Sequence, residues 1–148
     1  MSYQERRAIV SVISSFVVTV VYSAYMIQRF PAGDAYSPDV FRFWGVFFFI
    51  LIPVSIVAKI GVYIIASIIN TIATREVEPS ITDERDRLID LKGTRNSFYI
   101  FVAGFLLAMA TLVLEMPPSA MFIMLICAGV VSELVGDLSQ FYFYRRGY

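Results

Sequence analysis

The sequence predicts an all-α, polytopic membrane protein with four transmembrane helices in a bundle. Of its 148 residues, 58% are hydrophobic and 16% are aromatic, and the mean hydropathy is +0.71, far from the composition of a soluble domain. The hydrophobic residues also fall into long runs, and most charged residues lie between these runs or at their ends. Both observations favour a chain whose main solvent is lipid.

Each of four apolar runs is long enough to cross a hydrocarbon core of about 30 Å, because a helix rises about 1.5 Å per residue. The second run exceeds what a perpendicular span requires, so we expect it to tilt, to kink at Pro53 or to extend beyond the membrane. All four belong to one integral domain, and a polar loop divides them into two pairs. The expected spans are 8–30, 41–73, 97–114 and 120–144, with the loop at 74–96.

Basic residues predict the orientation of the chain. Only Arg29 and Arg42 lie on the side of the two short connections, and a larger set lies on the opposite side. The positive-inside rule therefore predicts that both termini and the loop are cytoplasmic. The larger set comprises Arg6, Arg7, Arg75, Arg85, Arg87, Lys92, Arg95, Arg145 and Arg146.

Aromatic residues gather where the first two spans meet the expected outer surface. They are Tyr22, Tyr25, Tyr36, Phe41 and Trp44. Rings at this level are typical of an interfacial aromatic belt, which anchors the helices at the height of the lipid headgroups.

Several classes of chemistry are excluded by composition. The chain has no histidine and one cysteine, Cys127, which removes His-based haem and zinc ligation, Cys-His catalysis and internal disulfides. Twelve basic residues balance twelve acidic ones, so no basic footprint indicates nucleic-acid binding. We therefore expect no catalytic residues, no metal and no cofactor, and we interpret Cys127 as a small core residue.

Small and hydroxyl residues recur every four positions in two helices. Ser11, Ser15, Thr19 and Ser23 share one face of the first span, which favours close helix contact with hydrogen bonds across it, or alternatively a hydrophilic conduction path. A second row in the fourth span favours internal packing or a homodimer seam. That row consists of Ala128, Ser132 and Gly136.

Three ionisable residues lie inside the expected spans. Glu133 and Asp137 share a face of the fourth span at i, i+4 spacing, and Lys59 lies in the second. Glu133 lies roughly 18 Å and Lys59 roughly 20 Å from the inner ends of their helices. A charge at the bilayer centre costs about 2.5–3.5 kcal/mol, so we expect Lys59 and Glu133 to pair. The cluster serves either as a proton or cation relay or as a device that fixes helix register.

Within the loop, charged residues alternate in sign. Leu88 and Leu91 share one helical face, so this stretch is either a surface amphipathic helix or an extension of the third span interrupted at Gly93. Asp83, Asp86 and Asp90 share another face, which could bind a divalent cation through oxygen ligands. Because arginines interleave with them, a solvated salt-bridge face is the simpler interpretation. The charged motif consists of Asp83, Glu84, Arg85, Asp86, Arg87 and Lys92.

The charged motif and the residues that follow it resemble a signature of known membrane proteins. Asp83-Glu84-Arg85, then Ile89, then Lys92-Gly93 ahead of a span resembles the DER-type signature in small prokaryotic four-span membrane proteins without an assigned activity. The resemblance covers residues 82–105 and the layout of the spans, and it implies a multi-pass protein of a prokaryotic inner (plasma) membrane. Genes of such proteins often neighbour helix-turn-helix regulators, which implies a regulatory or immunity-like role and supplies no catalytic residues.

Three classes of function follow. We expect a non-enzymatic regulatory or accessory subunit that acts through helix–helix assembly and the charged loop. Its expected partners are the lipid bilayer and either a second copy of the chain or another membrane or cytoplasmic protein. The alternative is a small proton- or cation-coupled transporter that uses Glu133 and Asp137 with Lys59. An enzyme is the weakest of the three, because the chain has no paired-aspartate lipid-transfer motif and no nucleotide-binding glycine loop.

Overall fold

The computed structural model describes residues 3–74 and 84–146, and its regular structure there is entirely helical. Every one of the four described helices is long and apolar enough to cross a membrane, judged by length and composition. The prediction of an all-α chain with four candidate spans is therefore confirmed. The helices are α1 (Tyr3–Ile27), α2 (Pro38–Thr74), α3 (Glu84–Val113) and α4 (Pro118–Arg146).

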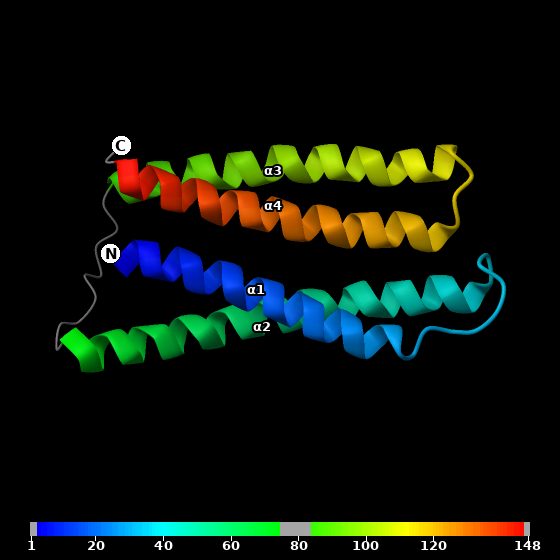
Figure 1. The fold of residues 1–148 in the computed structure, drawn as a ribbon, viewed down its shortest axis with the longest axis horizontal. Helices are drawn as coiled ribbons and strands as arrows, with labels where there is room; N and C mark the ends of the chain where they lie inside the picture. The colour runs from blue at the N-terminus through cyan, green and yellow to red at the C-terminus, as the bar shows by residue number, and fades with distance from the viewer. Residues whose placement is uncertain (1–2, 75–83, 147–148) are drawn as a thin grey trace.

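Successive helices run in opposite directions (Figure 1). The first residues of α1 and α3 and the last residues of α2 and α4 lie at one end of the molecule. The connections 28–37 and 114–117 lie at the other end. The described basic residues of the charged motif, at the beginning of α3, and those at the end of α4 therefore lie at one end of the molecule. Arg29 and Arg42 lie at the opposite end.

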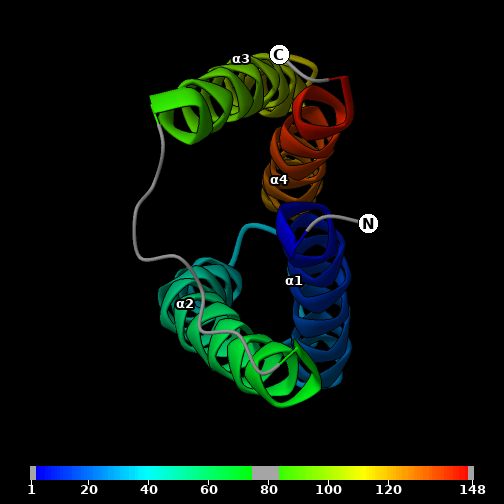
Figure 2. The ribbon, with the colours of Figure 1, turned by 90° about the vertical axis from the view of Figure 1, so that its left-hand side faces the viewer.

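The helices form an arc in the order α3, α4, α1, α2 (Figure 2). Over the described residues, α3 contacts α4 alone, and no Cα atom of α2 lies within 8 Å of one in α3. Beyond Phe48, none of the α2 side chains that the structure describes is buried. The arrangement is therefore more open than the closed four-helix bundle that the sequence suggests.

The most extensive packing is between α3 and α4, and small residues permit it. A Cβ atom on Gly104 would overlap the Cβ of Ala128, and one on Gly93 would lie 3.1 Å from the carbonyl oxygen of Gly136. Ser132 is also buried, and its hydroxyl donates to the Gly129 carbonyl at 2.8 Å. The row in α4 thus packs against α3, which leaves it no room to form a homodimer seam.

α3 differs from expectation at its beginning. It starts at Glu84 and continues without interruption through Gly93, so residues 84–96 belong to this helix and not to a loop. The absence of a side chain at Gly93 lets this part of α3 lie close to Gly136 and Gln140 of α4. Ile89 is buried in this part, at 2% exposure, whereas Leu88 and Leu91 are both exposed.

An aromatic core holds the opposite end together. Trp44 is 3% exposed, and its ring stacks on Phe122 of α4 at 5.3 Å and an interplanar angle of 15°. The hydroxyl of Tyr22 donates to the Phe47 carbonyl at 3.0 Å. Trp44 is therefore buried against α4 and not exposed as expected of a belt residue, whereas Tyr22 is only partly buried and Tyr25 is exposed.

Candidate functional site

The candidate site is a polar cluster near the middle of three helices. Lys59 of α2 forms an ion pair with Glu133 of α4, as their matched depths predict. Both side chains come from helices that flank α1 in the arc. Hydroxyl groups on α1 and α2 complete the cluster. Its members are Ser11, Ser15, Lys59, Tyr63, Glu133 and Asp137.

The first layer of the cluster surrounds the ion pair. The hydroxyl of Ser15 donates to Oε1 of Glu133 at 2.8 Å, and Lys59 contacts the same oxygen. Hydrogen bonds to an ionised acceptor are stronger than neutral ones. Glu133 thus joins α1, α2 and α4 at one carboxylate oxygen.

The second layer lies one helical turn closer to the end of the molecule that carries the termini. The hydroxyl of Tyr63 donates to the Ser11 oxygen at 3.2 Å, and Ser11 is hydrogen-bonded to the Asp137 carboxyl group. Because Ser11 has a single proton and accepts the Tyr63 hydrogen bond, its own proton points to Asp137. A continuous chain of hydrogen bonds therefore runs from α2 through α1 to α4.

Each of the three helices supplies two cluster residues four positions apart. The pairs are Ser11 and Ser15, Lys59 and Tyr63, and Glu133 and Asp137. Residues at this spacing lie on one helical face, one turn apart. Because neighbouring helices are antiparallel, the lower-numbered residue of α2 and α4 meets the higher-numbered residue of α1, which generates the two layers.

Charge is unbalanced within the cluster. It holds one ammonium group and two carboxyl groups, and Lys59 pairs with only one of them, Glu133. Oδ2 of Asp137 is buried and has no hydrogen-bond partner within the described part of the chain. Asp137 is therefore the surplus carboxyl group, able to take up a proton or to accept one further donor.

The ion pair is only partly covered. The side chains of Lys59 and Glu133 are 34% and 30% exposed. The cluster face of α1 is turned toward α2 and α4, while Ile13 and Val17 on the opposite face are exposed. The open part of the pair consequently belongs to the concave side of the arc.

Sequence reasoning found five of the six cluster residues and missed Tyr63. The available signal was its i+4 spacing from Lys59, which places both side chains on one face of α2. The other two members of the α1 face take no part: Thr19 is half-buried, and the Ser23 hydroxyl is buried with no hydrogen-bond partner among the described residues.

The charged motif lies far from the cluster, at the beginning of α3. Arg85 and Arg87 are exposed, as is Glu84, whereas the Lys92 ammonium lies 5.3 Å from the centre of the Phe143 ring in α4. Asp83 is outside the described residues. Among the residues described, no group of three or more His, Cys, Asp or Glu side chains could hold a metal ion.

Comparison with known proteins adds no assignment. No protein-family model, curated protein or solved structure matches this chain. The resemblance to DER-type four-span proteins accordingly stays a prediction.

Proposed function

We propose that the chain is a multi-pass membrane protein with both termini in the cytoplasm, acting as a non-enzymatic regulatory or accessory subunit through helix–helix assembly. One observation carries the proposal. The Lys59–Glu133 pair is about one third exposed on the concave side of an arc whose end helices, α2 and α3, have no Cα atoms within 8 Å of each other over their described residues.

Lipid is a poor cover for this surface. A charged side chain at the bilayer centre costs about 2.5–3.5 kcal/mol on insertion scales, and acyl chains offer no hydrogen bonds to offset it. Polar side chains or backbone from further helices can supply those hydrogen bonds. A second molecule that covers the concave side would satisfy the exposed part of the pair and give α2 the packing it lacks.

The charged motif supports a cytoplasmic role within such an assembly. Glu84, Arg85 and Arg87 are exposed at the beginning of α3, on a helix that is held to α4 through Ile89 and Gly93. These side chains would project from the membrane surface on a rigid helix. A cytoplasmic partner could therefore be recognised without any rearrangement of the spans.

The first test is the mass of the complex extracted from native membranes in a mild detergent, with an affinity tag after Tyr148. We expect a homo-oligomer or a stoichiometric complex with a second protein. A monomer that is extracted without any co-purifying protein would contradict the proposal.

The second test addresses the motif. Arg85→Glu combined with Arg87→Glu should release a cytoplasmic partner while leaving extraction yield and thermal stability unchanged, because both side chains are exposed. Arg42→Glu is the matched control, since it reverses an exposed arginine at the opposite end of the molecule. Deletion of residues 82–95 would be less informative, because it removes the packing of Ile89 and Gly93.

The hydrogen-bond chain from Tyr63 through Ser11 to Asp137 favours a second candidate, a proton- or cation-coupled transporter. Intramembrane Asp and Glu side chains form proton relays in pumps and transporters. In that case liposomes should show proton flux that Asp137→Asn and Glu133→Gln abolish. Asp39→Asn, at an exposed carboxylate at the beginning of α2, should leave the flux unchanged.

A further inference from the structure

Two neighbouring segments at one end of the α3–α4 pair carry only positive charges. In residues 91–99 of α3 and 138–146 of α4, every charged residue is basic. The Asn96 side chain donates to the Ser139 hydroxyl at 3.1 Å, so the two segments lie side by side, as Figure 1 also shows. The basic residues are Lys92, Arg95, Arg145 and Arg146.

Two of these cations share a face of α3 with two aromatic rings. Lys92, Arg95, Phe98 and Tyr99, here called the α3 stripe, lie within about one third of the helix circumference. Arg95 is exposed, and the two rings are 61% and 63% exposed. Gly93, on the opposite face, lies against α4. The stripe is therefore turned away from α4, toward the surroundings of the molecule.

Contacts with α4 fix the backbone that carries the two cations. The Lys92 ammonium lies 5.3 Å from the centre of the Phe143 ring, a favourable cation–π distance. Asn96, which follows Arg95 directly, is held to α4 by its hydrogen bond to Ser139. Arg95 itself forms no ion pair among the residues that the structure describes. Its guanidinium is thus presented on a rigid helix and is available to an anion.

The depth of the stripe matches the boundary between acyl chains and headgroups. Counted from Val113, where α3 ends, a hydrocarbon core of about 30 Å takes about 20 residues and ends near Gly93. Lys92 and Arg95 lie within about 3 Å of this boundary, and their long side chains reach the phosphate layer. Phe98 and Tyr99 lie roughly 8 Å inside it, at the level of the acyl chains.

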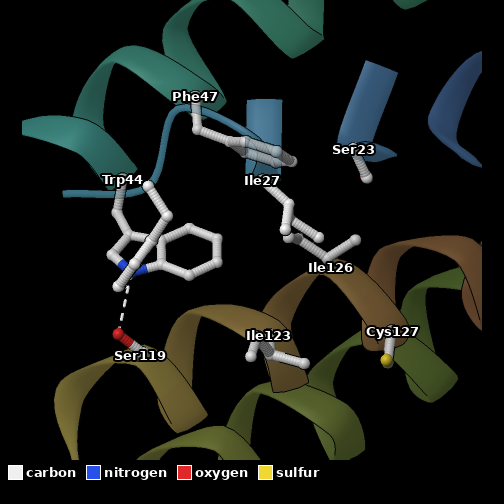
Figure 3. A pocket seen from close by; sticks show the side chains of 9 residues that line it. Ser23, Ile27, Trp44, Phe47, Ser119, Ile123, Ile126 and Cys127 are labelled. Atoms are coloured by element: carbon white, nitrogen blue, oxygen red, sulfur yellow. Dashed lines mark hydrogen bonds between the residues drawn. The ribbon is translucent and has the colours of Figure 1, made fainter. Parts of the chain in front are cut away.

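The opposite end of the molecule offers no comparable basic surface. A cavity of about 400 Å³ lies there between α1, α2 and α4, and none of its lining residues is charged (Figure 3). Trp44 donates there to Ser119 at 3.2 Å, and Cys127, expected in the core, lines the cavity and is exposed. Two basic and three acidic residues surround the short connections. They are Arg29, Asp34, Asp39, Arg42 and Glu115.

We propose that the α3 stripe binds an anionic phospholipid, with the headgroup phosphate at Lys92 and Arg95 and an acyl chain along Phe98 and Tyr99. A guanidinium matches a phosphate with two parallel hydrogen bonds. The four basic side chains of this end repel the quaternary ammonium of a choline headgroup, whereas a glycerol headgroup carries no such charge. The site therefore selects a lipid with net negative charge.

The same geometry disfavours other anions. Free phosphate would leave the two exposed rings of the stripe uncovered. A soluble protein would have to displace headgroups to reach Arg95, whereas Arg85 and Arg87 lie roughly 7–11 Å farther from the hydrocarbon core than Lys92 and stay available to a cytoplasmic partner. The lipid site rests on the membrane insertion proposed above and is independent of assembly.

Native mass spectrometry of the full chain in a mild detergent tests the site directly. The chain is titrated with phosphatidylglycerol and with phosphatidylcholine of the same acyl chains. We expect phosphatidylglycerol to saturate at one lipid per chain, about tenfold or more tighter than phosphatidylcholine, as several basic side chains together provide. An excess of inorganic phosphate should not displace the lipid.

Three variants assign the selectivity to the stripe. Arg95→Gln should weaken phosphatidylglycerol binding roughly fivefold and leave phosphatidylcholine unchanged, as expected for one basic side chain at the membrane surface. Arg95→Lys keeps the charge and should retain most of the affinity. Arg42→Gln is the matched control, because it removes an exposed arginine at the opposite end of the molecule. It should change neither affinity.

Each of several outcomes would overturn the lipid site. Equal binding of both lipids, or an equal effect of Arg95→Gln on both, would remove the selectivity. Displacement of phosphatidylglycerol by inorganic phosphate would show an anion site without lipid recognition. Loss of a co-purifying protein in Arg95→Gln with unchanged lipid binding would assign the stripe to that protein. The same spectra report the mass of the assembly, and carbonate extraction of membranes reports insertion, so a failure of the proposed function is detected separately.

Discussion

Lys59 of α2 and Glu133 of α4 form an ion pair even though α1 lies between their helices in the arc. The pair can reach across because the face of α1 at this level carries serine: Ser15 is buried there, and it donates to the same Glu133 oxygen that Lys59 contacts. A larger apolar residue at Ser15 would separate the two charges. The small hydroxyl residues of α1 and the charges of α2 and α4 therefore form one structural unit.

Neutralising one member of the pair should destabilise the protein more than neutralising both. Glu133→Gln leaves the Lys59 ammonium without its counter-ion, and we expect a loss of about 1–3 kcal/mol, less than for a fully buried pair because both side chains are about one third exposed. Lys59→Met with Glu133→Gln should recover much of this loss. The measurement is unfolding of the purified chain in detergent or bicelles.

The control for this series is Ile60→Met, which introduces the same residue at an exposed position of α2 next to Lys59. Its stability should stay within about 0.5 kcal/mol of wild type, as for most surface substitutions. A double variant no more stable than the worse of the two single variants would show that the pair does not couple α2 to α4.

Ser15→Ala tests the hydroxyl that supports the ion pair. It removes the donor to Glu133, and a hydrogen bond to a charged group contributes about 1.5–3 kcal/mol, so we expect a loss toward the lower end of that range. Ser14→Ala is a matched control on the neighbouring residue, because the Ser14 hydroxyl is buried and has no hydrogen-bond partner in the described ranges. Removing it should be neutral or slightly stabilising. Equal effects of both substitutions in thermal unfolding would argue against a special role for Ser15.

The four long apolar helices and the ion pair could be predicted from sequence, because each depends on one quantity that the sequence contains directly. Hydropathy defines the four runs, and counting residues from the helix ends puts Lys59 and Glu133 at similar depths. Four-residue spacing identified Ser11 and Ser15 as members of a contact face. Both side chains are buried, and both form hydrogen bonds to other helices.

What could not be predicted depends on which helices are neighbours. Trp44 resembles a belt residue in sequence, yet it is buried because Phe122 of α4 stacks on it from a distant part of the chain. Cys127 resembles a core residue, yet it is exposed because α4 turns a neighbouring face, that of Ala128, toward α3. The periodicity of one helix identifies a face but not the helix that covers it.

Glycine substitutions should distinguish close contact from open surface. A Cβ atom on Gly104 would overlap the Cβ of Ala128, so Gly104→Ala should destabilise the α3–α4 contact by about 1–3 kcal/mol, as overpacking does. Gly129→Ala is the control in α4, and Gly61→Ala is the control in α2. Neither of these two glycines has a neighbouring atom within 4 Å of the new methyl group. Both controls should be neutral or stabilising in thermal unfolding, because alanine favours helix by up to about 1 kcal/mol over glycine. A neutral Gly104→Ala would mean that α3 and α4 are not packed this closely.

Cysteine accessibility in intact cells should establish the orientation of the helices. Starting from Cys127→Ala, which removes the only thiol, Ala32→Cys places a thiol in the exposed connection after α1, and Arg85→Cys places one at the exposed beginning of α3. Because basic residues are concentrated at the end of the molecule that includes Arg85, the positive-inside rule predicts that this end is cytoplasmic. A membrane-impermeant maleimide should therefore label Ala32→Cys in intact cells and label Arg85→Cys only after permeabilisation. If Arg85→Cys were labelled in intact cells and Ala32→Cys were not, the orientation would be the opposite of the predicted one. The charged motif would then lie outside the cell, where a cytoplasmic partner could not reach it.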